Sequence, residues 1–346
     1  MDLSESLKAY IVEAEHQDLS VQISGQGSKS AWLPEVDGEM LNTLDHVGIE
    51  SYEPDELVIK ARCGTPLKEL RRLLAQENQL LPPDPPEFGD LGTVGGAIAS
   101  GFSGPARPWR GALRDSVLGV ELINGRGELM RFGGQVMKNV AGYDVSRLNT
   151  GAFGSLGLLL NVSLRVAPQP DHEATLRYEL SAEEALTMCR HIALKPYPVT
   201  GTFWHGGCLN VRLSGTEQGI NAVMSERGGE QIESQEMWTS IRDHRHVAFS
   251  VRDGGFLCRV IAPPSAPLPE GCDVAVEWGG GLRWVHTEEP AAIEAYAEKI
   301  GGWNWTVGAP VEISSGQRQL MKRIKHAFDP NGTFLSPLDL GDSNAH

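Results

Sequence analysis

The sequence predicts an α+β protein of two domains, and three observations support this fold class. The chain has 346 residues, of which 40% are hydrophobic, so it can build two separate cores. Patterns typical of helices and patterns typical of strands occur in both halves of the chain. Pro168 and Pro170, followed by Asp171 and His172, indicate a boundary between the halves.

The first half is expected to begin with an amphipathic helix over residues 4–15, which has Leu7, Ile11 and Ala14 on one face. Thr65 is expected to start a later helix, because threonine can cap a helix and is followed here by a proline. The other predicted elements are strands over 19–24, 57–62, 117–123, 129–132 and 156–166, a helix over 65–78, a rigid proline loop over 82–86 and a hairpin turn over 124–127.

The second half is expected to form a smaller α+β layer. Ser181, with Glu184 three residues later, has the pattern of a capping box at the start of a helix that runs to Leu194. The other predicted elements are strands over 174–180, around 202, and over 209–213, 256–261, 273–278 and 282–286, helices over 216–227 and 290–300, and a basic helix over 315–328.

Composition and charge exclude several classes of protein. A formal net charge of −15 without a basic stripe argues against binding to nucleic acid or to an anionic membrane. The N-terminus lacks the pattern of a secretory signal, and no apolar stretch is long enough to span a bilayer. Five cysteines without a CxxC pair predict free thiols and neither a metal site nor an iron–sulfur cluster. We therefore expect a cytoplasmic protein, whose contact with the inner membrane would run through partners.

Glycine is the most informative excess, with 40 residues that are densest between Gly89 and Gly157. Glycine serves where the backbone needs a positive φ or must approach a ligand closely. Gly25 and Gly27 follow a predicted strand, and a loop of this kind can turn backbone N–H groups toward a diphosphate. A plain tight turn is an equal alternative, and Ser30 rules out the GxGxxG fingerprint of a Rossmann fold.

Three more groups of residues suggest a ligand site. The small residues of Gly92–Gly101 leave no side chain to block a flat or charged ligand, although a helix packed closely on its neighbour would use the same residues. Arg110 and Asp115 lie on either side of a turn and suit a second face of the ligand, or else form an ordinary surface ion pair. The last group spans Lys138–Leu148, and further glycines come after it in the sequence.

The order and spacing of these four groups resemble the FAD-binding domain of the vanillyl-alcohol oxidase family, also called the PCMH type. The resemblance implies two α+β subdomains with FAD extended between them, then a smaller α+β cap domain and a C-terminal return segment that includes the turn over 328–332. It implies a FAD-binding domain over 1–170, a cap domain over 171–312 and the return segment over 313–346. It implies contacts with FAD for Ser24, Gly25, Gln26, Gly27, Ser28, Thr93, Val94, Gly95, Gly96, Ser100, Arg110, Gly111, Asp115, Gly157 and Leu159.

Within that family, residues 138–144 and the short chain resemble the small subunits of bacterial glycolate oxidases. This implies two partners, a larger FAD-binding catalytic subunit and an iron–sulfur subunit, and a small 2-hydroxy acid as substrate. Members that attach FAD covalently use a histidine in the pyrophosphate loop or a cysteine near the flavin, whereas this loop carries Ser28 and Lys29, so non-covalent FAD is expected. The Glu-His-Gly stretch of the metal-dependent members of the family is absent from this sequence. Residues 152–154 also differ from the Gly-Ser-Glu-Gly sequence that the family often has at this place.

The expected function is the transfer of electrons from glycolate, or a related 2-hydroxy acid, through FAD toward the iron–sulfur partner. A free-standing FAD-linked hydroxy-acid or alcohol dehydrogenase and a non-catalytic assembly subunit with a vestigial FAD site are the alternatives. The sequence assigns no catalytic residue: His205, Arg283 and His286 are candidates in the cap, and each is more typical of a structural role. His244 and His246 suggest a metal, but no carboxylate or cysteine stands at ligand spacing, so a solvated turn is favoured.

Overall fold

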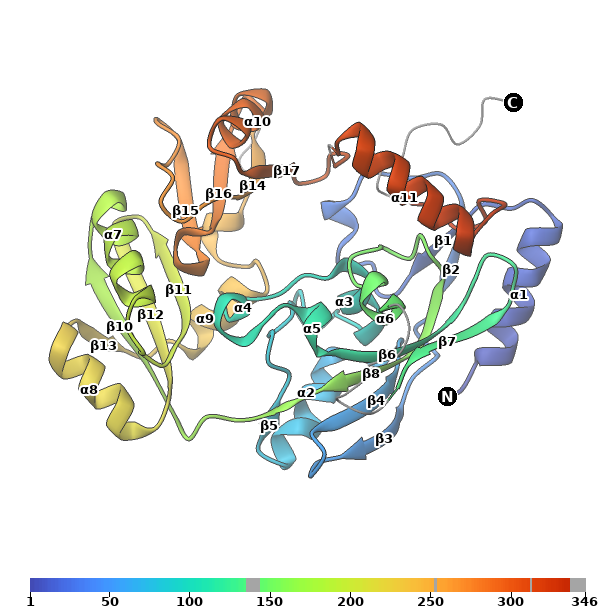
Figure 1. The fold of residues 1–346 in the computed structure, drawn as a ribbon, viewed down its shortest axis with the longest axis horizontal. Coiled ribbons are helices and arrows are strands. Elements are labelled where there is room, and N and C mark those ends of the chain that lie inside the picture. Colours follow the sequence, from blue (N-terminus) through green and yellow to red (C-terminus); the bar gives the residue numbers. More distant parts are fainter. Residues whose placement is uncertain (135–143, 252–253, 312, 337–346) are drawn as a thin grey trace. The chain divides into compact units, whose positions relative to one another are not determined.

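The structure is a computed structural model that describes residues 1–134, 144–251, 254–311 and 313–336. Two compact units make up the chain (Figure 1). The first unit contains Met1–Phe102, Ala112–Pro168 and the chain from Pro310 onward, and the second contains Ser103–Gly111 and Gln169–Ala309. Each unit combines helices with sheets, which confirms the predicted α+β class.

A small parallel sheet and one helix form the first part of the first unit. Helix α1 (Ser4–His16) buries Leu7, Ile11 and Ala14, the three residues predicted for its apolar face. Strand β1 (Val21–Ser24) pairs in parallel with β2 (Glu39–Asn42). Phe334 forms a parallel bridge with Val21 of β1 and packs into the same hydrophobic core as α1. The C-terminal part of the described chain therefore completes the N-terminal subdomain.

A five-stranded antiparallel sheet forms the larger part of the first unit. Its strands, in spatial order, are β3 (Ile49–Glu53), β4 (Val58–Arg62), β8 (Leu158–Arg165), β6 (Val117–Ile123) and β7 (Leu129–Gly133). Strands β6 and β7 form the predicted hairpin. Helices α2 (Leu67–Gln76) and α3 (Val94–Ser100) contribute Leu70, Leu74 and Ile98 to the core of this sheet.

The start of α2 differs from the prediction in one detail. Thr65 makes no capping contact with the helix, and Pro66 occupies the cap position. The buried Thr65 hydroxyl instead accepts a hydrogen bond from the backbone N of Gly48 at 3.0 Å and lies 3.2 Å from its backbone O. Tertiary contact with the segment before β3 therefore takes the place of the expected local cap.

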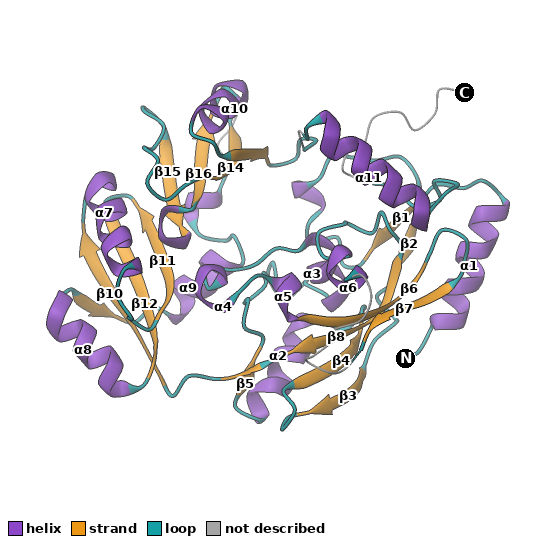
Figure 2. Ribbon diagram, viewed as in Figure 1, coloured by secondary structure: helices purple, strands orange, loops and turns teal. Residues whose placement is uncertain are grey.

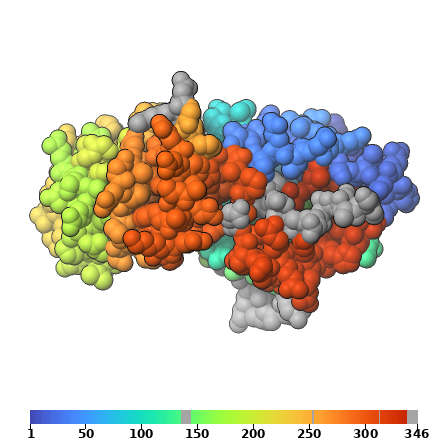
Figure 3. Space-filling model, turned by 90° about the horizontal axis from the view of Figure 1, so that it is seen from above, coloured from blue at the N-terminus to red at the C-terminus, as the bar shows by residue number. Residues whose placement is uncertain are grey.

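Short elements and the last helix complete the first unit. The short elements are η1 (Ser30–Trp32), β5 (Gln79–Leu80), which pairs with β9 (Ala167–Pro168), α5 (Leu113–Ser116) and α6 (Val145–Leu148). Helix α11 (Ser315–Phe328) coincides with the predicted basic helix and begins at a capping box formed by Ser314 and Gln317. It has no fully buried side chain, and the C-terminal residues that include it lie at the surface (Figure 3).

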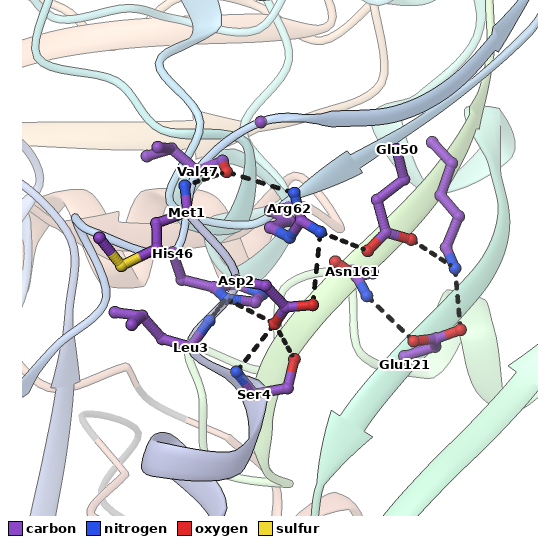
Figure 4. Close-up of polar contacts among 12 residues, drawn as sticks. Met1, Asp2, Leu3, Ser4, His46, Val47, Glu50, Arg62, Glu121 and Asn161 are labelled. Atoms are coloured by element: carbon purple, nitrogen blue, oxygen red, sulfur yellow. Dashed lines mark hydrogen bonds and ion pairs between the residues drawn. The ribbon is translucent and has the colours of Figure 1, made fainter.

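A chain of ion pairs joins the N-terminus to the large sheet (Figure 4). Arg62 on β4 lies 3.3 Å from Asp2 and 3.4 Å from Glu50 on β3. Lys60, also on β4, lies 2.8 Å from Glu50 and 2.9 Å from Glu121 on β6. Because opposite charges alternate along this series of ion pairs, each of the two cations lies between two carboxylates, and the series links the first residues of the protein to β3, β4 and β6.

An eight-stranded antiparallel sheet forms the second unit (Figure 2). Its strands, in spatial order, are β13 (Glu230–Ile232), β10 (His172–Glu179), β12 (Cys208–Gly215), β11 (Val199–His205), β15 (Asp273–Glu277), β16 (Leu282–Thr287), β14 (Phe256–Ile261) and β17 (Trp303–Thr306). Helices α7 (Ala182–Ala193), α8 (Glu217–Arg227) and α10 (Pro290–Lys299) pack apolar side chains on one face of this sheet. Helix α7 begins at the predicted capping box of Ser181 and Glu184.

The second unit also contains elements that the sequence analysis did not predict. They are α4 (Arg107–Arg110), β13, α9 (Gln235–Arg242), η2 (Val247–Phe249), η3 (Trp278–Gly280) and β17. Residues 103–111, expected in the FAD-binding domain, belong to this unit by their contacts. One such contact is the hydrogen bond that Trp278 Nε1 donates to the backbone O of Gly104 at 3.2 Å. No helix within the described ranges is long and apolar enough to cross a membrane.

Candidate functional site

The loop after β1 contains two glycines with different roles. A Cβ at Gly25 would lie 2.9 Å from Thr93 Oγ1, so this glycine lets the loop approach the start of α3. Gly27 has φ +68° and open space around its Cβ position. In the described part of the chain no acceptor takes a hydrogen bond from the backbone N–H of Gly27, Ser28 or Lys29. Three successive amide donors are therefore available to an anion, as the sequence analysis expected of this loop.

The start of α3 is held by hydrogen bonds within the protein. Thr93 caps the helix, because its side chain accepts a hydrogen bond from the backbone N of Gly96 at 3.1 Å. The backbone N of Val94 donates to Thr65, and that of Gly95 donates to Cys63. Because these three amides already have partners, they cannot serve as the main grip on a phosphate.

Gly95 and Gly96 differ although they are neighbours. A Cβ at Gly95 would lie 2.7 Å from Cys63 Cβ and 2.9 Å from the Cys63 backbone O, so this residue is glycine because the helix packs on its neighbour. A Cβ at Gly96 would lie 3.1 Å from Thr93 Oγ1 and 3.6 Å from Lys29 Nζ. The alternative of close helix packing thus holds at Gly95, while Gly96 lies beside the two polar side chains.

Lys29 is the most unusual charged residue of the first unit. Its exposed fraction is only 9%, and its Nζ has one hydrogen-bond partner, Ser28 Oγ at 3.3 Å. No carboxylate of the described chain forms an ion pair with it. Burial lowers the pKa of the Lys29 ammonium from 10.5 to about 8. Burying an ammonium without a counter-charge costs free energy, and an anionic ligand would offset this cost.

An aromatic side chain lies beside this lysine and belongs to a group of rings that the sequence pattern did not indicate. Lys29 Nζ lies 5.0 Å from the centre of the Phe88 ring, within the range of a cation–π interaction. The rings of Phe88 and Phe102 both lie near Trp32, and Phe102 also lies 6.3 Å from Phe153. We call these four residues the aromatic cluster. They come from four separate segments, so no local sequence pattern could have revealed the cluster.

Backbone strain accompanies the aromatic cluster. Phe88 has φ +50° and Phe153 has φ +51°, conformations that bulky residues rarely adopt. Arg71 holds the proline loop before Phe88, since it donates to Asp84 Oδ1 at 2.8 Å and to the backbone O of Pro85 at 2.8 Å, and also pairs with the buried Glu87. Strained residues that surrounding contacts hold in place occur often at ligand sites.

Several other predicted site residues have partners in the protein. Ser100 is buried and donates to the backbone O of Gly96 at 2.9 Å. Asp115 accepts a hydrogen bond from the backbone N of Ala112 at 3.0 Å and is 42% exposed. Its nearest cation contacts are loose, with Arg114 at 3.9 Å and Arg147 at 4.0 Å. The expected role of these two residues in binding FAD stays a prediction.

Gly157 and Leu159 are part of the protein core. A Cβ at Gly157 would lie 2.7 Å from the backbone O of Ile123. Leu159 packs in the core of the large sheet. Their predicted contact with the adenine end of FAD would therefore involve backbone atoms. Arg110 and Gly111 belong to the second unit, and residues 138–143 lie outside the described residues.

The candidate catalytic residues of the second unit have structural contacts. Arg283 is fully buried and donates to the backbone O of Pro267 at 2.8 Å and of Ala266 at 2.6 Å, so it holds the loop before β15. His286 Nε2 lies 3.0 Å from the backbone O of Ala248. His205 lies 3.4 Å from Asp273. No group of three or more potential ligands within the described residues could hold a metal ion.

Comparison with known proteins identifies the class to which this site belongs. The model of the FAD binding domain family matches residues 3–133, a range that includes the Gly25–Lys29 loop and α3. Two crystal forms of alkyldihydroxyacetonephosphate synthase share the fold, with TM-scores of 0.67 and 0.68 at 13% sequence identity. The similarity covers 95% and 96% of this chain and 74% and 75% of those structures. The fold is therefore that of the PCMH-type FAD-binding proteins.

Sequence relatives narrow the assignment within this class. Glycolate oxidase subunit GlcE of Escherichia coli (strain K12) is 37% identical over 339 residues, which are 96% of this chain and 96% of the relative. The chain belongs to the PCMH-type FAD-binding family and, within it, to the group of this subunit, which confirms the resemblance seen in the sequence. Glycolate oxidase subunit GlcD of Bacillus subtilis (strain 168) is 30% identical, but the match covers 48% of this chain and 36% of the relative.

The residues around Lys29 fit the pyrophosphate of FAD. The loop has available amide donors and open space at Gly27, and Lys29 adds a positive charge that has no counter-charge within the described chain. Cys63, by contrast, is buried against Gly95, and burial raises the pKa of its thiol. A thiol that cannot ionise is a poor nucleophile, so Cys63 does not suit a covalent link to the flavin.

Proposed function

We propose that this protein is the FAD-binding subunit of a complex that oxidises glycolate or a closely related 2-hydroxy acid. The observation that carries the proposal is Lys29, a buried ammonium without a carboxylate partner in the described chain, beside a loop with available amides. The relation to glycolate oxidase subunit GlcE over 96% of both chains supports the substrate.

The proposed pyrophosphate site consists of the loop from Ser24 to Ser28, together with Lys29, Thr93 and Gly96. The amides of Gly27 and Ser28 would donate to phosphate oxygens, and Lys29 would supply the balancing charge. Thr93 is positioned by its capping bond to Gly96 and holds this end of α3 against the loop. Lys29 is buried with its ammonium beside the Phe88 ring, and the low exposure to water strengthens its attraction to an anion.

We propose that FAD is bound without a covalent link. The Gly25–Lys29 loop contains no histidine or cysteine, and Cys63 is buried with a thiol whose pKa is raised. When bound, the flavin supplies the two-electron redox chemistry that amino-acid side chains lack. The protein residues named above bind and orient the dinucleotide and exclude water from its phosphates. No residue of the described chain is assigned as the base for the substrate hydroxyl.

A larger FAD-binding catalytic subunit and an iron–sulfur subunit are the proposed partners. Two relatives bear the names of different subunits of glycolate oxidase, which supports a multi-subunit assembly. The chain itself offers no cysteine pattern for a cluster, so electrons that leave the flavin need a partner to receive them. The proposed location is the cytoplasm, with any contact with the inner membrane made through these partners.

The decisive experiment compares the isolated chain with the assembled complex. We expect the purified chain to carry one non-covalent FAD, which acid precipitation releases into the supernatant. Glycolate-dependent dye reduction should require the other subunits. Full glycolate oxidation by the chain alone would favour a free-standing dehydrogenase, and a colourless chain that still assembles would favour a vestigial FAD site.

A further inference from the structure

The face of the second-unit sheet opposite α10 carries an arginine with an unusual environment. Arg259 lies on β14, where its neighbours Cys258 and Val260 pack toward α10. Since successive side chains of a strand point to opposite faces, Arg259 points away from this helix. It pairs across the sheet with Trp284 on β16 and with Trp305 on β17. A charged residue on a strand that is paired on both sides, opposite a tryptophan on each neighbouring strand, needs an explanation beyond packing.

Arg259 shares one indole ring with a second arginine. Its guanidinium carbon lies 5.4 Å from the centre of the Trp278 ring, and that of Arg107 lies 4.7 Å from the same ring. No acceptor in the described chain takes a hydrogen bond from the Arg259 side chain, and no carboxylate there lies within ion-pair distance. By comparison, Arg283 in the same unit donates to the carbonyls of Ala266 and Pro267. The donors of Arg259 are thus available to a ligand.

Glu277 does not neutralise this arginine. It is 3% exposed, and its Oε1 accepts a hydrogen bond from Trp284 Nε1 at 2.7 Å. Burial raises the pKa of Glu277 to about 7, and burial together with the charge of Arg107 lowers the pKa of Arg259 to about 10. A close ion pair would shift both pKa values in the opposite directions, so burial dominates over mutual attraction here. Arg259 therefore keeps its positive charge without a carboxylate within ion-pair distance in the described chain.

The backbone beside this cluster is held in a strained conformation. Trp278 has φ +55° and is 7% exposed. Its Nε1 donates to the backbone O of Gly104, and the next amide, that of Gly279, donates to Thr202 Oγ1 at 2.7 Å. These bonds hold the indole within reach of both guanidinium groups. Strain held in this way is typical of residues that must present a group to a ligand.

We propose that Arg259, with Arg107 on the same Trp278 ring, binds the carboxylate of a small monocarboxylic acid. Resting on the proposed function, this carboxylate is that of the 2-hydroxy acid substrate. A guanidinium presents paired N–H donors that match the two oxygens of a carboxylate, and the single negative charge of a carboxylate balances the charge of Arg259. The cluster positions the substrate; it is not assigned a role in the chemical step.

Binding of glycolate to the FAD-loaded full chain tests the proposal by calorimetry. Arg259→Met removes the charge and keeps an unbranched apolar side chain against the tryptophans, and Arg259→Lys keeps the charge without the paired donors. Arg245→Met is the matched control, since Arg245 is 47% exposed and pairs with Glu236 at the surface. Ethylene glycol, which has the size of glycolate but no carboxylate, is the control ligand.

We expect Arg259→Met to weaken glycolate binding by about tenfold or more, the loss typical of one charge-assisted hydrogen-bonded contact. Arg259→Lys should fall between wild type and Arg259→Met, Arg245→Met should bind as wild type, and ethylene glycol should not bind. Wild-type affinity in a folded Arg259→Met protein, or equal binding of ethylene glycol and glycolate, would overturn the proposal. If Arg259→Met does not fold, Arg107→Met is tested with the same expectation.

The assembled complex separates this proposal from the proposed function. If wild-type complex oxidises glycolate and Arg259→Met leaves its KM unchanged, the carboxylate site is wrong and the proposed function stands. If the chain binds glycolate through Arg259 but the complex does not oxidise it, the proposed function is wrong and the carboxylate site stands. A raised KM with kcat nearly unchanged supports both.

Discussion

Lys29 combines two properties that oppose each other in the protein without a ligand. Its ammonium is charged at neutral pH, yet it is buried beside the Phe88 ring with Ser28 as its hydrogen-bond partner. A pKa lowered from 10.5 to about 8 corresponds to a cost on the order of 3 kcal/mol for keeping the charge in the folded protein. A residue that costs this much stability is understandable if it contributes to the binding of an anion.

The first prediction follows from the contrast between the charge of Lys29 and its burial. Lys29→Met should stabilise the FAD-free protein at pH 7, by up to about 3 kcal/mol, because it removes a buried charge. The same variant should bind FAD roughly tenfold to a hundredfold more weakly, because it removes a charge-assisted contact. Urea unfolding of the FAD-free protein and fluorescence titration with FAD measure the two effects.

The control for Lys29→Met is Lys68→Met. Lys68 is 66% exposed and pairs with Asp90 at the surface, so its loss should change neither quantity much. An Arg at position 29 should retain part of the FAD affinity. If Lys29→Met bound FAD as tightly as wild type, the ammonium would have no part in the site.

The pH dependence of FAD binding gives a second prediction at this scale. The pKa of Lys29 in the FAD-free protein is about 8, and a bound pyrophosphate would raise it, since an opposite charge favours the protonated form. Affinity should therefore be constant below pH 8 and fall above it, by up to about tenfold per pH unit, because binding then requires the uptake of a proton. Titrations with FAD between pH 6 and pH 9.5 measure this change (on the order of tenfold per unit at most).

The same titrations of Lys29→Met show whether the lysine is responsible. The variant has no group at position 29 to protonate, so its weaker affinity should not decline through the same range. A parallel decline in both proteins would assign the pH dependence to another group.

The elements of the fold could be predicted where the signal is local. The apolar spacing of α1, the hairpin of β6 and β7 and the capping box at Ser181 each depend on residues close together in the sequence, and each is confirmed. The short strands β13 and β17 and helix α9 were missed because their patterns are brief and tertiary pairing decides their state. Thr65 was misassigned as a cap because a distant segment, at Gly48, competes for its hydroxyl.

The candidate site was only partly predictable for the same reason. The Gly25–Gly27 motif indicated a loop with close approach and positive φ, and the structure has both, since glycine alone provides them at little cost. The sequence could not tell that Gly95 packs on Cys63 whereas Gly96 lies beside Lys29. It also could not bring Phe88 to the lysine, because the two lie on different segments.

The two neighbouring glycines of α3 give a prediction at the scale of the element. Gly95→Ala places a methyl group 2.7 Å from Cys63 Cβ and should destabilise the FAD-free protein by about 1–3 kcal/mol. Gly96→Ala should leave its stability unchanged or raise it by up to about 1 kcal/mol, because alanine favours a helix. It should nevertheless weaken FAD binding, since its methyl group lies 3.1 Å from Thr93 Oγ1 and 3.6 Å from Lys29 Nζ.

Thermal unfolding and FAD titration of both variants, without and with FAD, provide the test. Gly95→Ala serves as the control for Gly96→Ala, because the two changes are chemically identical and one residue apart. The assignment is contradicted if Gly96→Ala retains full FAD affinity, or if Gly95→Ala has wild-type stability.

At the scale of the whole molecule, the first unit is built from both ends of the chain. Its segments enclose the second unit in sequence, so the first unit is complete only when residues beyond Pro310 have been added. The backbone N of Val21 on β1 donates to the backbone O of Thr333 at 2.7 Å, and Phe334 is buried in the core with α1. The return segment is thus part of the subdomain that carries the Gly25–Lys29 loop at the end of β1.

Asp329 holds the return segment in place. Its carboxylate is fully buried and accepts hydrogen bonds from Lys325 Nζ at 2.7 Å, from the backbone N of Thr333 at 2.9 Å and from that of Phe334 at 2.8 Å. Gly125, in the turn between β6 and β7, leaves no room for a Cβ above this carboxylate. Lys325 in turn donates to the backbone O of Ser155 and of Phe334.

The last prediction concerns this closure. Asp329→Asn replaces an acceptor with a donor amide that must face the Lys325 ammonium or a backbone N–H, and it leaves that ammonium without its counter-charge. We expect a loss of about 3–5 kcal/mol in the free energy of unfolding, the range typical of breaking a buried ion pair. FAD should also be released at lower urea, because β1 depends on the return segment. Asn331→Ala, which removes an exposed hydrogen bond to Glu15 at 2.7 Å, is the control and should cost less than about 1 kcal/mol. If Asp329→Asn unfolds and releases FAD at the same urea concentration as Asn331→Ala, the closing turn does not stabilise the FAD-binding subdomain.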